Sequence, residues 1–197
     1  HFYDIFRYQI LDTNSYIEEI WAYGYWAIDR CARIIKEGAS FKEVTKGDLA
    51  EVEGCIAQAY AIKALCSFYL TNMFGLPYSE ANKTTLGIVN VTEPVPAYSQ
   101  VSRVSVEQNY SLILDDITKA KEYYAKEGVE NVGKQYMNTA AVAALEARVK
   151  LYMKNYEGAI TAAQEAITLS GGTVVSTKED YKNMYTTLAV STEDIFF

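Results

Sequence analysis

The sequence predicts an all-α fold made of helical hairpins, with one long loop inserted between two of the helices. Apolar residues recur at three- and four-residue spacing through most of the chain, which is the pattern of amphipathic helices. All three prolines, Pro77, Pro94 and Pro96, fall in one segment, so the rest of the chain has no helix-breaking proline. We find no run of strand patterns that would build a sheet.

The first strong helix is predicted over residues 16–37. Ser15 followed by Glu18 has the spacing of a capping box, which satisfies free backbone N–H groups at a helix start. Gly38 is the expected stop, because glycine commonly follows the last helical residue. The preceding residues 1–13 are rich in aromatic side chains and are also expected to be helical.

The second helix is predicted over residues 49–74, with Asp48 and Glu51 as its start signal. Apolar residues cover so much of its circumference that we expect it at the centre of the core. The face expected to turn inward carries Val52, Cys55, Ile56, Ala59, Ile62, Cys66, Tyr69, Leu70 and Met73, with a second stripe of Ala61, Leu65 and Phe68.

The third helix follows the long loop and begins at a second capping box, Ser105 with Gln108. It is expected to end near Gly128. The residues predicted to face inward are Val106, Tyr110, Ile113, Leu114, Ile117, Ala120 and Tyr124.

A helical hairpin is predicted at residues 138–170. Its first helix begins at Asn138 or Thr139, residues 154–155 make a short turn, and the second helix ends at Gly171. Many alanines let the two helices approach closely. The second helix carries Ile160, Ile167 and Leu169 beside Ala159, Ala163 and Ala166, whose spacing is that of a tetratricopeptide hairpin. Since one repeat cannot stand alone, the second and third helices are expected to form a partner repeat.

The tail, residues 173–197, is expected to hold a short helix and an extended end. The chain starts at His1 and stops within an apolar run, so we expect a single helical domain over residues 1–197 that is an excerpt of a longer protein. The sequence has no stretch of 18 apolar residues, so no transmembrane helix is predicted.

Composition excludes several function classes. The net charge is −7 and no cluster of Lys or Arg reverses it locally, which argues against nucleic-acid binding. His1 is the only histidine, so the chain lacks Ser-His-Asp, Cys-His and His-rich metal constellations. Phosphate-binding glycine loops are also missing. We therefore expect no catalysis, no metal and no cofactor, and we expect the Asp115-Asp116 pair on a solvated helix face.

The three cysteines predict little about chemistry. Cys31, Cys55 and Cys66 form no CxxC pair. Cys55 and Cys66 would lie ~16 Å apart along one helix, too far for a disulfide. We expect all three to be buried thiols that act as small apolar residues.

The long loop, residues 75–102, is the most informative non-helical stretch. Loops of this length are often functional. Tyr78, Asn82 and Tyr98 offer ring faces and an amide, the groups that carbohydrate sites use, although packing of the loop onto the helices would explain them too. The 17 tyrosines are open to the same two interpretations. Trp21 lies on an apolar stripe and is expected in the core, whereas Trp26 falls off it and offers either a sugar-stacking ring or a contact surface.

Five segments in order resemble the SusD/RagB family. They are residues 21–35, 59–78, 87–120, 140–167 and 181–196, including Phe74-Gly75-Leu76-Pro77-Tyr78 and Ala147-Arg148-Val149-Lys150-Leu151-Tyr152. Lys63 stands where the family commonly has arginine. The resemblance implies a tetratricopeptide-like helical scaffold, an α-α superhelix, without enzymatic activity.

The resemblance also implies partners and a location. Family members are lipid-anchored at the outer membrane, face the cell surface, and capture glycans or other nutrients for a TonB-dependent, SusC-like transporter. The anchor would lie outside this chain. The alternative is a tetratricopeptide-type scaffold that binds proteins and not carbohydrate. The long loop favours the first interpretation, because ordinary repeat scaffolds use short turns. An enzyme is the third and least favoured possibility.

Overall fold

The computed structural model describes residues 6, 7, 9, 11, 13–44, 49–186 and 193–195. This part of the chain contains six helices and no strand beyond one isolated bridge between Leu86 and Ser105. The helices are α2 (Ser15–Val44), α3 (Leu49–Phe74), α4 (Val106–Tyr124), α5 (Thr139–Tyr152), α6 (Tyr156–Ser170) and α7 (Lys178–Thr186). The all-α prediction is confirmed, and the structure has the predicted bounds of α3.

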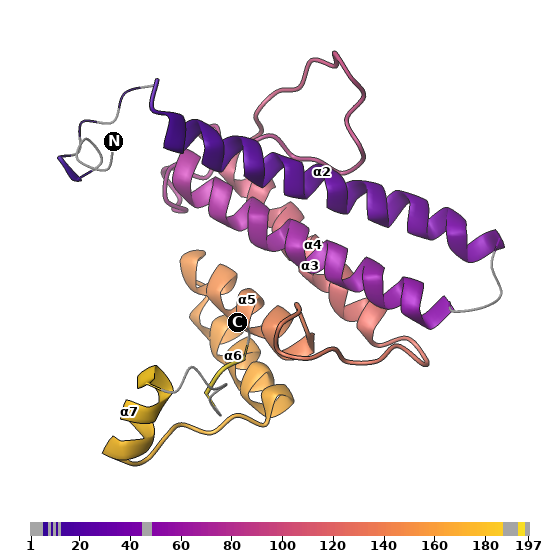
Figure 1. Cartoon of the computed structure of the whole chain (residues 1–197). Helices are drawn as coiled ribbons and strands as arrows, with labels where there is room; N and C mark the ends of the chain where they lie inside the picture. Colours follow the sequence, from indigo (N-terminus) through magenta and orange to yellow (C-terminus); the bar gives the residue numbers. More distant parts are fainter. Residues whose placement is uncertain are drawn as a thin grey trace.

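Helices α2 to α6 pack in chain order (Figure 1). α3 lies between α2 and α4. α4 packs on α5, and α5 packs on α6. α5 and α6 form the predicted hairpin, and α3 packs on α4 as expected of a partner repeat. α7 lies beyond α6, at the end of the molecule away from α2. None of the described helices is both long and apolar enough to cross a bilayer.

Two groups of buried side chains hold the helices together. The larger lies where α3, α4 and α5 meet and includes Phe68, Tyr110, Ile113, Val142 and Leu145. The smaller joins α2 and α3 to the long loop and consists of Ile28, Ala32, Leu70, Ile88 and Val91. Burial of apolar area contributes roughly 25 cal/mol per Å², so these two groups supply the main drive for packing. Two residues of the loop, Ile88 and Val91, are therefore part of the core.

The start and end of α2 differ from the prediction. Asn14 caps the helix: its side-chain oxygen accepts from the backbone N–H of Tyr16 (3.1 Å) and of Ile17 (3.4 Å), so Ser15 is already helical. The helix also continues through Gly38 to Val44. At Gly38 a Cβ atom would lie 2.9 Å from the side chain of Ile56, so this glycine permits close packing of α2 on α3 and does not end the helix. The predicted helix over 1–13 and the start signal at Asp48 lie largely outside the described residues.

Other helix ends follow the sequence signals. Ser105 and Gln108 form the predicted capping box of α4, which ends at Tyr124, before Gly128. Asn138 caps α5 by accepting from the N–H of Ala141 at 2.8 Å. Gly171 ends α6 with a φ of 60°, a conformation that glycine adopts without strain. These ends were predictable because each is decided within three or four residues.

Burial corrects several expectations about single residues. Asp116 is not solvated: it is buried beneath α3 and pairs with Lys63. Cys55 is exposed, whereas Cys31 is buried and Cys66 is partly buried. Tyr69 and Met73 are exposed although they were assigned to the inward face of α3. α3 packs through Ala57, Ala61 and Ala64, since small residues let α4 and α5 come close, together with the buried ring of Phe68, while Tyr69 and Met73 lie outside this contact.

The inward face of α6 also consists of small residues. Ala159, Ala162 and Ala166 are buried, while Ile160 and Ile167 are exposed. The reason is again the close approach of α5 and α6, which favours small side chains on α6. Trp21 is partly buried and packs edge-on against Phe74 (4.8 Å between ring centres) beside the smaller core group, whereas Trp26 is exposed.

Candidate functional site

One arginine, Arg103, holds the two ends of the long loop together. The Arg103 guanidinium donates hydrogen bonds to the backbone oxygens of Phe74 (2.7 Å), Leu86 (3.3 Å) and Gly87. These three carbonyls come from the end of α3 and from the middle of the loop. A guanidinium can serve several acceptors at once because its donors are fixed in one plane. Arg103 thereby ties the two arms of the loop to the end of α3.

The middle of the loop is held by two further side chains. The Asn109 amide accepts from the N–H of Ile88 (2.8 Å) and donates to its carbonyl (3.1 Å). The Tyr25 hydroxyl accepts from the N–H of Val89 (2.8 Å) and donates to its carbonyl (3.0 Å). Burial raises the pKa of Tyr25 to about 12, so the hydroxyl stays protonated. Consecutive residues of the loop are thus fixed to α4 and to α2.

The three loop residues predicted from sequence occupy different surroundings. Tyr78 is half-buried and packs edge-on against Tyr110, with 4.9 Å between ring centres. The Asn82 amide donates to the carbonyl of Pro77 at 3.0 Å, within the loop. Tyr98 is fully exposed, in a turn with a φ of 65°. Among the described residues, no hydrogen bond or ring contact joins Tyr98 to Tyr78 or Asn82. Their role in ligand binding stays a prediction.

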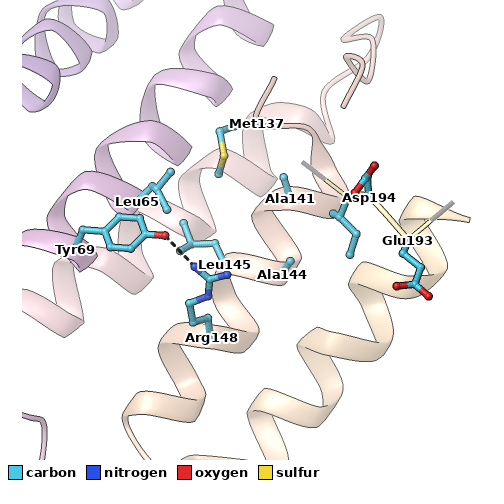
Figure 2. Close-up of a pocket in the computed structure, with 10 residues that line it drawn as sticks. Leu65, Tyr69, Met137, Ala141, Ala144, Leu145, Arg148, Glu193 and Asp194 are labelled. Carbon is cyan, nitrogen blue, oxygen red and sulfur yellow. Dashed lines mark hydrogen bonds between the residues drawn. The ribbon is translucent and has the colours of Figure 1, made fainter. Parts of the chain in front are cut away.

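A cleft of about 380 Å³ lies on another face of the molecule, where α3, α5 and the segment 193–195 meet (Figure 2). Its apolar wall is formed by Leu65, Met137, Ala141, Ala144 and Leu145. Segment 193–195 is held in place by Ile195, whose carbonyl accepts from the Asn138 amide at 3.4 Å. Ile195 itself packs against the larger core group.

Hydrogen-bond donors and acceptors both line this cleft. Arg148 on α5 donates to the hydroxyl of Tyr69 on α3 at 3.0 Å, and this contact orients the guanidinium. Glu193 and Asp194 line the other side (Figure 2). One oxygen of Glu193 accepts from the N–H of Val175 at 2.6 Å. The cleft therefore offers donors, acceptors and an apolar wall, which are the groups of a binding site for a polar organic molecule.

Tyr69 and Arg148 are not predicted as a site from the sequence alone. The two residues lie 79 positions apart, and only the packing of α3 against α5 joins them. One signal was available: Arg148 stands on a helix otherwise rich in alanine and valine. A charged residue within such a run is a candidate for a specific contact.

A second hollow, of about 580 Å³, lies between the start of α3 and the segment 128–136. Cys55, Glu51, Gln58 and Tyr136 line it. In the described part of the chain no group of three or more His, Cys, Asp or Glu side chains is placed to hold a metal ion.

The comparisons with known proteins agree on one family. The model of a SusD-like family, described as starch-binding and associating with the outer membrane, matches residues 3–151. Among curated proteins none matches this chain.

Several solved structures are similar to the chain. A putative sugar-binding protein from Bacteroides vulgatus is 28% identical, with a TM-score of 0.76 over 90% of this chain and 40% of its own. A SusD superfamily protein from Bacteroides thetaiotaomicron is also 28% identical, with a TM-score of 0.72 over 83% of this chain and 35% of its own. A laminarin-binding SusD-like protein shares the fold at 20% identity, with a TM-score of 0.64, over 85% of this chain and 34% of its own.

The chain therefore spans two fifths or less of the length of these three structures. The match of the family model covers most of the chain, and the likeness of fold to the putative sugar-binding protein covers 90% of it. The resemblance seen in the sequence is confirmed, and the chain belongs to the SusD-like family.

Proposed function

We propose that this protein is a non-catalytic component of an outer-membrane nutrient uptake complex, which captures oligosaccharides at the cell surface and delivers them to a TonB-dependent, SusC-like transporter. The family description, starch-binding and associating with the outer membrane, supports the carbohydrate and the location. One relative of the same fold is a laminarin-binding protein. In this proposal the lipid anchor belongs to a part of the protein outside this chain.

The observation that carries the proposal is the exposed ring of Tyr98 on an anchored loop. Stacking of a sugar on an aromatic ring requires an accessible ring face, and Tyr98 is fully exposed. A platform also binds more tightly when it is already ordered, because less conformational entropy is lost on binding. Arg103, Asn109 and Tyr25 order the loop below this turn. Tyr78 and Asn82 then act as supports at the base of the loop.

The cleft between α3 and α5 is a second candidate contact for the same ligand. Sugar hydroxyls both donate and accept hydrogen bonds. Arg148 can donate, while Glu193 and Asp194 can accept, beside an apolar wall that suits the C–H face of a sugar ring. We propose the cleft as an additional contact, independent of Tyr98.

Affinity gel electrophoresis with laminarin or amylopectin in the gel tests the proposal. The wild-type protein should be retarded by at least one of the two polysaccharides. Tyr98→Ala should lose most of the retardation, whereas Tyr156→Ala, which removes an exposed ring on α6, should keep it. Wild-type migration unchanged by either polysaccharide would contradict carbohydrate capture and would favour a protein-binding scaffold. The polysaccharide should be recovered uncleaved if the protein has no enzymatic role.

The transporter partner needs a separate test. We expect the full-length protein to co-purify from outer membranes with a TonB-dependent transporter. Co-purification with another protein, and none with a transporter, would contradict the delivery role and leave glycan capture standing.

A further inference from the structure

The outer face of α2 carries an aromatic pair that the proposed function does not use. Tyr23 and Trp26 are each 58% exposed, and their rings meet edge to face with 5.1 Å between centres. They lie one turn apart on a 30-residue helix, which packs on α3 through its opposite side. Each ring restricts the movement of the other. The pair is thus a pre-ordered aromatic surface in contact with water.

Hydrogen-bonding groups stand directly beside this pair. Asp29 and Arg33 follow Trp26 at i+3 and i+7, on the same side of the helix. Arg33 holds Asp29 through two contacts, Nε to Oδ2 (2.7 Å) and Nη2 to Oδ1 (3.3 Å). Each carboxylate oxygen retains a second lone pair, and the guanidinium retains N–H donors. An indole face next to a fixed acid and guanidinium matches a sugar ring, which has an apolar C–H face and hydroxyls at its edge.

The long loop runs along the same helix. The Tyr25 hydroxyl, adjacent in sequence to Trp26, holds Val89, and Lys36 Nζ lies 3.4 Å from a carboxylate oxygen of Glu93. Figure 1 shows the loop rising beside α2. The element that presents Tyr98 is therefore attached to the helix that presents Trp26. A glycan of several sugar units could contact the loop and continue onto α2.

We infer that Tyr23 and Trp26, with Asp29 and Arg33, form a second glycan-binding surface on α2, which stacks one sugar ring of a linear neutral glycan. This inference rests on the proposed function and names a further contact for the same class of ligand. A neutral glycan fits better than a charged one, because Asp29 and Arg33 neutralise each other. The surface adds binding for long glycans and little for a disaccharide.

The test compares Trp26→Ala, Trp26→Phe and Phe41→Ala with the wild type in affinity gels containing laminarin or amylopectin. Phe41 is the matched control: it is an exposed aromatic residue of α2, 15 positions and ~22 Å farther along the axis. We expect Trp26→Ala to weaken retardation about three- to tenfold, a range typical for loss of one aromatic contact. Trp26→Phe should retain much of the binding, and Phe41→Ala should match the wild type.

A spectroscopic readout separates direct contact from indirect effects. In a Trp21→Phe background, Trp26 is the only indole, so its emission reports on this surface. Laminarihexaose or maltoheptaose, chosen by the polysaccharide that retards the protein, should shift the emission and protect it from acrylamide quenching. Laminaribiose or maltose should do so weakly.

Each outcome decides the inference. Loss of retardation in Tyr98→Ala with full retardation in Trp26→Ala would overturn it and leave the proposed function intact. Equal losses in Trp26→Ala and Phe41→Ala would also overturn it, since the exposed side of α2 would then act as a general apolar surface. Unchanged emission in the presence of a bound hexasaccharide or heptasaccharide would exclude stacking on Trp26. A wild-type protein that neither polysaccharide retards would overturn both the inference and the proposed function.

Discussion

Lys63 and Asp116 form an ion pair in the core, with the Lys63 ammonium 2.8 Å from one carboxylate oxygen of Asp116. Their side chains are 3% and 4% exposed. The other carboxylate oxygen of Asp116 is buried and has no hydrogen-bond partner in the described part of the chain. The pair joins α3 to α4 at the centre of the fold. Both residues lie in segments that resemble the SusD/RagB pattern. Lys63 occupies the position where that family commonly has arginine.

Removal of one partner of this pair should destabilise the protein strongly. Lys63→Met leaves the buried Asp116 carboxylate without its counter-charge, and such losses cost about 3–5 kcal/mol. The double variant Lys63→Met/Asp116→Leu replaces both charges by apolar groups and should recover most of this loss. Urea unfolding followed by circular dichroism measures both. A single variant as stable as the wild type would show that the ion pair does not hold α3 and α4 together.

The same pair should make stability depend on pH. Burial raises the pKa of Asp116 from 3.8 to about 6, against the opposing effect of Lys63. Between these two values the folded protein binds more protons than the unfolded chain, so the contribution of Asp116 to the free energy of unfolding falls as pH rises. The wild type should therefore lose stability relative to Asp116→Asn between pH 4 and pH 7. The difference between their urea midpoints, measured across this range, checks the sign; a constant or opposite difference contradicts it.

Two glycines should respond in opposite ways to alanine. A Cβ at Gly87 would lie 1.8 Å from the side-chain oxygen of Asn109, which holds the loop, so Gly87→Ala should displace the loop and lower the Tm. At Gly54, inside α3, the nearest atom to a Cβ is a methyl carbon of Val129 at 3.6 Å, an ordinary contact. Gly54→Ala should stabilise the protein by up to about 1 kcal/mol through helix propensity. Thermal melts of the two variants compare them directly.

Arg103→Gln should loosen the long loop without unfolding the helices. The change removes donors to the carbonyls of Phe74, Leu86 and Gly87. We expect a loss of about 1–3 kcal/mol, the cost of leaving such groups unpaired. Hydrogen exchange should be faster at the amides of residues 87–89, while the amides of α5 should keep their protection. Arg30→Gln on the exposed face of α2 is the control, and equal exchange in the two variants would contradict the anchoring role of Arg103.

The three thiols should differ in reactivity. Cys55 is exposed, whereas burial raises the pKa of Cys31 to about 11 and also raises that of Cys66. The thiolate is the reactive species, so an aromatic disulfide reagent should label Cys55 quickly and the other two only on unfolding. Cys55→Ser should abolish the fast phase. A fast phase that persists in this variant would show that the core opens at Cys31 or Cys66.

Local sequence signals were sufficient for the helices and for most of their ends. The Ser105 and Gln108 box, the Asn138 cap and the glycine after α6 each act within four residues, so no distant contact was needed to read them. The predicted helix end at Gly38 was wrong, because this glycine makes room for Ile56 on the neighbouring helix and does not end α2. The Tyr98 ring could be named from the loop sequence, but its exposure could not.

The sequence by itself determined an all-α scaffold, one long loop and the SusD-like family, because periodicity, capping and motif order are properties of neighbouring residues. Only the tertiary structure decided that Asp116 is buried, since its partner Lys63 lies 53 positions away on another helix. The same holds for the cleft, where α3 and α5 bring Tyr69 to Arg148, and for the three carbonyls that converge on Arg103. Such contacts depend on how helices pack, and packing is decided by the whole core at once.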